Sequence, residues 1–131
     1  MDSSSIVHYG FNQWHSFSLG NRHLLLRLAG NSLGAYVIRH KGGQFGRLRG
    51  NSDILYIGKS TGQNGMRARI NSYFNPGPTQ WTNQRIHSFL QREVPMEISF
   101  VITENPRQLE SQLLQQYVKD HDELPPFNRS E

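Results

Sequence analysis

Three segments of the chain carry short runs of β-branched and aromatic residues, which are typical of strands. They are Gly34–Arg39, Ile54–Ile57 and Met96–Thr103, and the last alternates apolar and polar positions in the order MEISFVIT. The stretch His40–Gly50, between the first two, is rich in glycine and basic residues. The pattern therefore predicts a hairpin with an unusually long connection, to which a third strand is added.

Other segments repeat their apolar residues at the spacing of a helix. In Met66–Phe74 every fourth residue is apolar. Trp81–Leu90 predicts a second helix with Ile86, Phe89 and Leu90 on its apolar side, and Pro106–Val118 predicts a third. A proline suits the first turn of the last helix, and Asn105 before it is expected to cap that helix. The apolar stretch Leu24–Leu28 fits a short helix or a strand, and we favour a helix.

This order of elements predicts a small α/β domain of the α+β kind, in which a mostly antiparallel three-stranded sheet is flanked by helices. The 131 residues fit a single domain with one modest core. We place the domain at residues 33–131 and expect residues 1–32 to form an N-terminal extension that packs on it.

The net charge of +4 is unevenly distributed along the chain. Between positions 34 and 93 there are nine Lys and Arg residues, opposed only by Asp53 and Glu93, whereas residues 94–131 hold seven acids and three bases. A basic centre beside an acidic end predicts a polyanionic partner. Nucleic acid is favoured over a membrane, because the sequence has no basic amphipathic helix and no membrane-spanning run. A solvated charged surface is the alternative.

The sequence argues against cysteine-based sites, a zinc site and a secretory signal. The chain has no cysteine, and its six histidines are scattered without a paired spacing, which argues against zinc. The start, MDSSS, lacks the basic-then-apolar pattern of a secretory signal, so a cytoplasmic location is expected.

The sequence GKST at positions 58–61 raises the question of a phosphate-binding P-loop. Such a loop requires a glycine five residues before the first residue of GKST, where this chain has Asp53. The intervening Ile54–Ile57 has the character of a strand and not of a loop. A nucleotide-phosphate site at this position is therefore excluded.

Two tyrosines of the predicted hairpin begin an ordered series of polar residues. Tyr36 stands in GAY and Tyr56 in YIGK; the basic stretch MRARINSYF follows, then Glu110 inside the last helix and Asn128 in PPFN. Over roughly residues 33–128 this series resembles the GIY-YIG nuclease family. It is most similar to the N-terminal nuclease domains of bacterial excision-repair incision subunits and to compact restriction-type relatives. The first motif departs mildly, with alanine at its middle position.

The resemblance implies the GIY-YIG nuclease fold and a divalent-metal-dependent DNA endonuclease that hydrolyses phosphodiester bonds at a single-metal site. The catalytic residues that it implies are Tyr36, Tyr56, Lys59, Arg69, Tyr73, Glu110 and Asn128. Glu110 would hold Mg²⁺ or Mn²⁺, because a carboxylate is a hard oxygen ligand. Arg69 would pair with phosphate oxygens through its fork of donors. Taken singly, each of these residues also fits an ordinary structural role, and the order and spacing of the set favour the site.

The roles of the remaining members are less tightly defined. Tyr56 or Tyr36 would orient or deprotonate the attacking water, and the sequence leaves open which one, or whether a histidine shares the task. Lys59 would supply a second cation. Tyr73 lies one helical turn after the catalytic arginine, so both are expected to face one pocket. Asn128 would fix the surrounding loop by hydrogen bonds.

The expected partner is DNA. The residues predicted to contact it are Lys41, Arg47, Arg49, Arg67, Arg85 and His87. We interpret the long connection His40–Gly50 as a DNA-contacting loop, with a plainly solvated loop as the alternative. For His87 an ordinary surface position is favoured.

Two further alternatives stay open. The chain would act either as a compact nuclease that forms a homodimer, or as a catalytic domain working with other domains or with repair or restriction partners. A non-catalytic nucleic-acid-binding module on the same fold is the alternative function. The presence of both Glu110 and Arg69 favours the enzyme, since a degenerate module would be expected to lose one of them.

Overall fold

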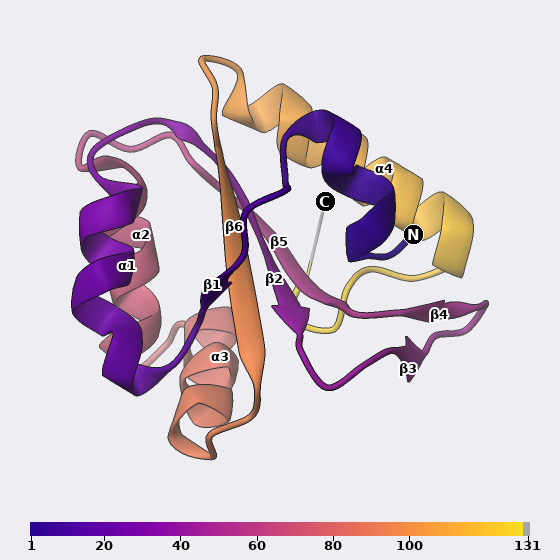
Figure 1. The fold of residues 1–131 in the computed structure, drawn as a ribbon, viewed down its shortest axis with the longest axis horizontal. Helices are drawn as coiled ribbons and strands as arrows, with labels where there is room; N and C mark the ends of the chain where they lie inside the picture. The colour runs from indigo at the N-terminus through magenta and orange to yellow at the C-terminus, as the bar shows by residue number, and fades with distance from the viewer. Residues whose placement is uncertain (130–131) are drawn as a thin grey trace.

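The computed structural model describes residues 1–129, in which helices lie on both sides of a central sheet (Figure 1). The helices are η1 (Ser3–Tyr9), η2 (Leu19–Asn21), α1 (Arg22–Ala29), α2 (Gly65–Phe74), α3 (Trp81–Gln91) and α4 (Pro106–His121). The strands are β1 (His15–Ser16), β2 (Gly34–His40), β3 (Phe45–Gly46), β4 (Asn51–Ser52), β5 (Ile54–Ser60) and β6 (Met96–Ile102). Among the described residues, no helix is long and apolar enough to cross a membrane.

The main sheet has the strand order β1-β6-β2-β5, and all its pairs are antiparallel. The predicted three-stranded sheet is confirmed in β2, β5 and β6, and the two-residue β1 extends it at one edge. Within the long connection, β3 pairs with β4 to form a separate short ribbon. Consequently β2 is central, whereas β5 is the opposite edge of the sheet.

The two faces of the sheet bury different sets of side chains, because side chains alternate along a strand. On one face Tyr36, Ile38 and Tyr56 pack with residues of α1, α2 and α3. On the other face Val37 and Ile57 pack with η1 and α4. The sheet is thus covered on both sides. In Figure 1 it lies between α1, α2 and α3 on the left and η1 and α4 on the right.

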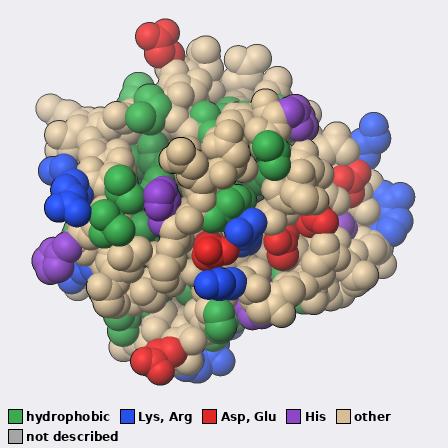
Figure 2. Space-filling model, viewed as in Figure 1, with side chains coloured by type: hydrophobic (Ala, Val, Ile, Leu, Met, Phe, Trp, Pro, Cys, Tyr) green, Lys and Arg blue, Asp and Glu red, His purple; other side chains and the backbone are tan. Residues whose placement is uncertain are grey.

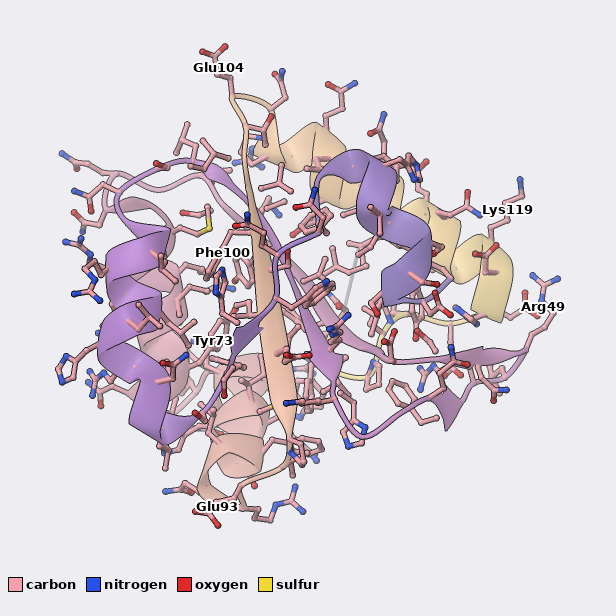
Figure 3. All side chains as sticks on the ribbon, in the orientation of Figure 1. Arg49, Tyr73, Glu93, Phe100, Glu104 and Lys119 are labelled. Atoms are coloured by element: carbon pink, nitrogen blue, oxygen red, sulfur yellow. The ribbon has the colours of Figure 1, made fainter. Side chains whose placement is uncertain are left out.

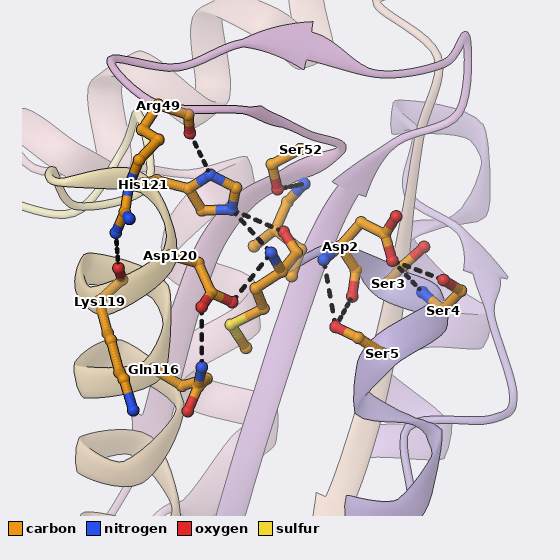
Figure 4. A network of polar contacts seen from close by, with 12 residues as sticks. Asp2, Ser3, Ser4, Ser5, Arg49, Ser52, Gln116, Lys119, Asp120 and His121 are labelled. Atoms are coloured by element: carbon orange, nitrogen blue, oxygen red, sulfur yellow. Dashed lines mark hydrogen bonds and ion pairs between the residues drawn. The ribbon is translucent and has the colours of Figure 1, made fainter.

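Residues before position 33 contribute to both layers. Ile6 and Phe11 are buried against the α4 face, and Phe17 and Leu25 belong to the opposite cluster. The close view in Figure 4 includes the start of the chain, where the amino group of Met1 lies 3.0 Å from the Asp120 carboxylate. The domain boundary at residues 32 and 33 stays a prediction.

The helix predictions are largely confirmed. The favoured helix at Leu24–Leu28 is present as α1, and α4 continues three residues beyond the predicted end at Val118. The expected cap by Asn105 is wrong, because its side chain makes no capping hydrogen bond. Its backbone φ and ψ of −120° and 59° differ from the extended conformation of a capping residue.

One glycine is required by the packing of a core tyrosine. Gly58 pairs with Tyr36 across β5 and β2. A Cβ atom built on Gly58 would lie 2.5 Å from Cζ of the Tyr36 ring. Any larger residue at this position would therefore have to displace a fully buried aromatic side chain.

We expect Gly58→Ala to lower the free energy of unfolding by about 1–3 kcal/mol, because the added methyl group overpacks the core. Urea unfolding measures this change. Gly20→Ala is the matched control, since a Cβ atom at Gly20 meets no atom within 4 Å. Equal losses in the two variants would contradict the packing argument.

Candidate active site

A pocket of about 590 Å³ lies beside the edge strand β5. Its walls are formed by β5, the loop 61–64 and α2, together with single residues of α3 and α4 and the segment 128–129. The predicted catalytic residues that line it are Tyr56, Lys59, Arg69, Glu110 and Asn128. Residues that are up to 72 positions apart in the sequence therefore meet in one cavity.

Both faces of β5 contribute to this pocket. Tyr56 belongs to the face covered by α2, where Arg69 is located, whereas Lys59 pairs across the sheet with Ala35, which faces α4. The Lys59 ammonium contacts Oε1 of Glu110 at 2.8 Å. This carboxylate is 12% exposed, so it is largely removed from bulk water yet opens into the pocket.

Asn128 completes the free edge of β5. Its side-chain amide donates to the carbonyl of Ile57 at 2.9 Å, and its Oδ1 accepts from the backbone N–H of the same residue at 3.0 Å. One residue earlier, the N–H of Phe127 donates to the carbonyl of Leu55 at 3.0 Å. The segment therefore satisfies backbone groups that an edge strand would otherwise leave open.

Two of the predicted catalytic tyrosines lie behind the pocket wall. Tyr36 and Tyr73 are fully buried, and their hydroxyl groups share a 2.5 Å hydrogen bond. The rings of both lie about 6.1 Å from that of Tyr56. Figure 3 labels Tyr73 in the interior, between the helical layer and the sheet. The structure thus brings Tyr73 next to Arg69, as expected, but does not expose its hydroxyl in the pocket.

Burial keeps the phenols of Tyr36 and Tyr73 neutral, and the neighbouring Arg69 stays charged. Burial raises the pKa of Tyr36 and of Tyr73 well above the ordinary value. The interaction with Tyr73 raises the pKa of Arg69 above its already high ordinary value. Desolvation of the guanidinium acts in the opposite direction but is the smaller effect. The Arg69 guanidinium also lies 5.9 Å from the centroid of the Tyr73 ring. A fixed positive charge is therefore held at the pocket wall.

Within residues 1–129 no group of three or more His, Asp or Glu side chains could enclose a metal ion. Among the described residues that line the pocket, those within 1–129, Glu110 is the single carboxylate. Its Oε2 atom has no hydrogen-bond or ion-pair partner in this described part of the chain. A hard cation could use that oxygen and take its remaining ligands from water or phosphate.

No protein-family model matches the chain, and neither does any curated protein sequence. Solved structures do match. The magnesium-bound GIY-YIG N-terminal endonuclease domain of UvrC from Thermotoga maritima superposes with a TM-score of 0.52 at 24% identity, covering 82% of this chain and 96% of that one. The chain has the GIY-YIG nuclease fold. A tyrosine-to-phenylalanine mutant of the same domain, bound to its catalytic divalent cation, gives a TM-score of 0.53 at 23% identity, covering 84% of this chain and 97% of that one.

On this GIY-YIG fold, the long connection between β2 and β5 lies away from the pocket. Arg47 forms an ion pair with Glu123 at 3.0 Å, and Arg49 forms one with Asp122 at 3.3 Å. Figure 3 labels Arg49 close to Lys119, at the C-terminal end of α4. Both arginines are thus bound by ion pairs to acidic residues that follow α4. The structure does not bring Arg47 or Arg49 to the other predicted site residues.

The other predicted DNA contacts are also outside the GIY-YIG pocket. Lys41, Arg67 and Arg85 are exposed, but none lines the pocket. The half-buried His87 is 2.9 Å from the backbone carbonyl of Tyr73 through its Nδ1 atom, which gives this ring a structural contact.

Some pocket residues were not expected from the sequence. Ser72, Thr82 and Arg129 contribute to the lining. For Arg129 the only signal was its position directly after Asn128. Ser72 and Thr82 carried no signal, since their place depends on how α2 and α3 pack.

The buried tyrosine pair of this GIY-YIG fold predicts a loss of stability in alkali. In the unfolded chain a phenol deprotonates near pH 10, whereas burial keeps Tyr36 and Tyr73 protonated in the folded chain. Above about pH 10 the folded state binds more protons than the unfolded state. The free energy of unfolding should therefore be unaffected by this pair below that pH and fall above it, by up to about 1.4 kcal/mol per pH unit for each phenol.

Urea unfolding between about pH 8 and pH 11 measures this slope. Burial also raises the pKa of Tyr117 on the opposite face, so the slope of the wild type contains its contribution. The difference between the wild type and a variant with both Tyr36→Phe and Tyr73→Phe isolates the pair. An alkaline slope that is the same in both proteins would disprove the assignment.

Proposed function

We propose that the protein is a divalent-metal-dependent DNA endonuclease, which hydrolyses phosphodiester bonds through a single-metal GIY-YIG site. One observation carries the proposal: Glu110, Lys59 and Arg69 meet in one pocket of a fold shared with the UvrC endonuclease domain. A carboxylate and two cations around a cavity suit a phosphodiester, whose charge must be neutralised during hydrolysis.

The chemistry of the donor set fits Mg²⁺ or Mn²⁺. Glu110 would hold the cation through a carboxylate that is mostly shielded from solvent and whose Oε2 has no partner among residues 1–129. Magnesium is commonly bound by one or two carboxylates and keeps several waters, so a single glutamate is sufficient. A cation bound there supplies Lewis-acid stabilisation of the charge that develops on the phosphate.

The two basic residues would bind the substrate phosphate. Arg69 presents a planar fork of donors that matches phosphate oxygens, and its raised pKa keeps it charged throughout the accessible pH range. Lys59 is held next to Glu110 at 2.8 Å in the free protein, which keeps its ammonium at the pocket until a phosphate is present.

Among the three clustered tyrosines, Tyr56 is the one that lines the pocket. We assign to its hydroxyl the orientation of the attacking water. The hydroxyls of Tyr36 and Tyr73 bond to each other in the interior, so we assign them the positioning of Tyr56 and Arg69. Of the two hairpin tyrosines, we thus choose the one that lines the pocket.

The test is cleavage of supercoiled plasmid in Mg²⁺ or Mn²⁺ at low salt, so that binding to the DNA backbone is not screened. We expect nicked or linear product from the wild type and none in EDTA. Glu110→Gln should slow cleavage at least about a hundredfold, because a loss of roughly 3 kcal/mol of transition-state stabilisation has that effect.

Glu104→Gln is the matched control, since it makes the same change at an exposed glutamate outside the pocket. Added Mg²⁺ should also raise the melting temperature of the wild type but not that of Glu110→Gln. Plasmid that is retarded but never cut, with both variants behaving alike, would favour the non-catalytic DNA-binding module.

A further inference from the structure

Beside the pocket, one tryptophan is contacted by two arginines. The guanidinium carbons of Arg85 and Arg129 each lie 4.9 Å from the centroid of the Trp81 ring. Both arginines are exposed, and the ring between them is partly exposed. We refer to these three residues as the arginine strip. Arg129 also lines the pocket, so the strip begins at the candidate active site and continues onto α3.

The arginine strip is fixed relative to the pocket by hydrogen bonds of its neighbours. The hydroxyl of Thr82, the residue after Trp81, donates to the backbone carbonyl of Phe127 at 3.0 Å. The residue before Arg129 is Asn128, whose side chain is bonded twice to β5. The start of α3 and the segment 127–129 are therefore tied together and to the edge strand, so the two cations have defined positions.

The surroundings of the arginine strip leave its charges available. Helices α1, α2 and α3 contain no Asp or Glu, and within residues 1–129 neither arginine of the strip forms an ion pair. Arg47 and Arg49, in contrast, are paired with acids near α4. On the face drawn in Figure 2, basic side chains over α1, at the left edge, have no acidic neighbour in the view, whereas acids and bases are mixed on the right.

We infer that the arginine strip binds the phosphodiester backbone of the DNA strand next to the scissile phosphate. This inference rests on the proposed function and extends it to the path of the substrate. An arginine stacked on an aromatic ring keeps the N–H groups at its edge free to donate to phosphate oxygens. Because both guanidinium carbons contact one ring, they lie no further apart than twice 4.9 Å, which suits neighbouring phosphates of one strand.

The role of Trp81 follows from the same geometry. Ordering two long side chains on binding costs conformational entropy. Stacking on a rigid ring already restricts them in the free protein, so less entropy is lost when DNA binds. Trp81 is thus a positioning residue for the two arginines. In the long connection His40–Gly50, by contrast, Arg47 also lies over an aromatic ring, that of Phe45, but it and Arg49 are already paired with acids.

The experiment measures the affinity for a fluorescein-labelled DNA duplex by anisotropy, in EDTA so that no cleavage occurs, across a series of salt concentrations. For each phosphate contact that is removed, the slope of log K against log [salt] should fall in magnitude by about 0.9. We expect this fall for Arg85→Gln and for Arg129→Gln, and about twice the fall for the double variant.

Arg92→Gln is the matched control. Arg92 is an exposed arginine just beyond the far end of α3, and its guanidinium lies 4.8 Å from the Phe89 ring, so it has the same charge and the same kind of stacking. It does not line the pocket. The slope of this variant should equal that of the wild type, and a fall equal to that of the strip variants would overturn the inference in favour of diffuse attraction.

A second readout reports on the location of the DNA. The chain has two tryptophans, so in Trp14→Phe the emission comes from Trp81 alone. DNA should change this emission. The change should be lost when Arg85→Gln and Arg129→Gln are added to the Trp14→Phe variant. DNA that binds without changing the emission contradicts the inference but leaves the proposed function intact. DNA that neither binds nor is cut by the wild type contradicts the proposed function itself.

Discussion

The candidate site depends on the position of β5 at the edge of the sheet. A central strand has neighbours on both sides, whereas β5 has one side open, and side chains from both of its faces can meet around that side. Tyr56 comes from the α2 face and Lys59 from the α4 face, and the pocket forms where the two layers approach each other. An open edge is also a liability for association between chains, and here Asn128 covers it with two hydrogen bonds. The same residue thus protects the strand and borders the cavity.

The core behind the pocket explains why three tyrosines occur so close together. Tyr36 and Tyr73 share a hydrogen bond in a region without solvent, and the absence of a side chain at Gly58 gives the first of them its space. Burial makes ionisation of these two phenols unfavourable, so they act as neutral packing groups with one polar handle. Arg69 is held against this cluster, and its charge faces the cavity. A rigid, neutral wall that orients one cation is a form of electrostatic preorganisation.

Much of the fold was accessible from the sequence, because strands and helices follow from local periodicity. Periodicity predicts the hairpin of β2 and β5 and the helices α2 to α4. The family resemblance, and not periodicity, singles out the set Tyr56, Lys59, Arg69, Glu110 and Asn128, which the structure brings to one pocket. What could not be predicted depends on contacts between distant residues. Local sequence does not reveal that Arg47 is neutralised by Glu123, or that Tyr36 and Tyr73 are sealed behind the wall. Nor does it show that the two residues of β1 find a partner in β6, since so short a strand has no pattern of its own.

The pairing of residues 127 and 128 with β5 has a consequence for how the protein folds during its synthesis. Asn128, which covers the edge of the strand, is 71 positions after Ile57, its hydrogen-bond partner in β5. At about 5–20 residues per second, several seconds pass on the ribosome between the emergence of β5 and that of its cover. During that interval the edge strand is exposed and the pocket lacks one wall. The nascent chain is therefore most vulnerable to misassembly just before its site is complete, and a fragment that stops short of Asn128 would retain the exposed edge.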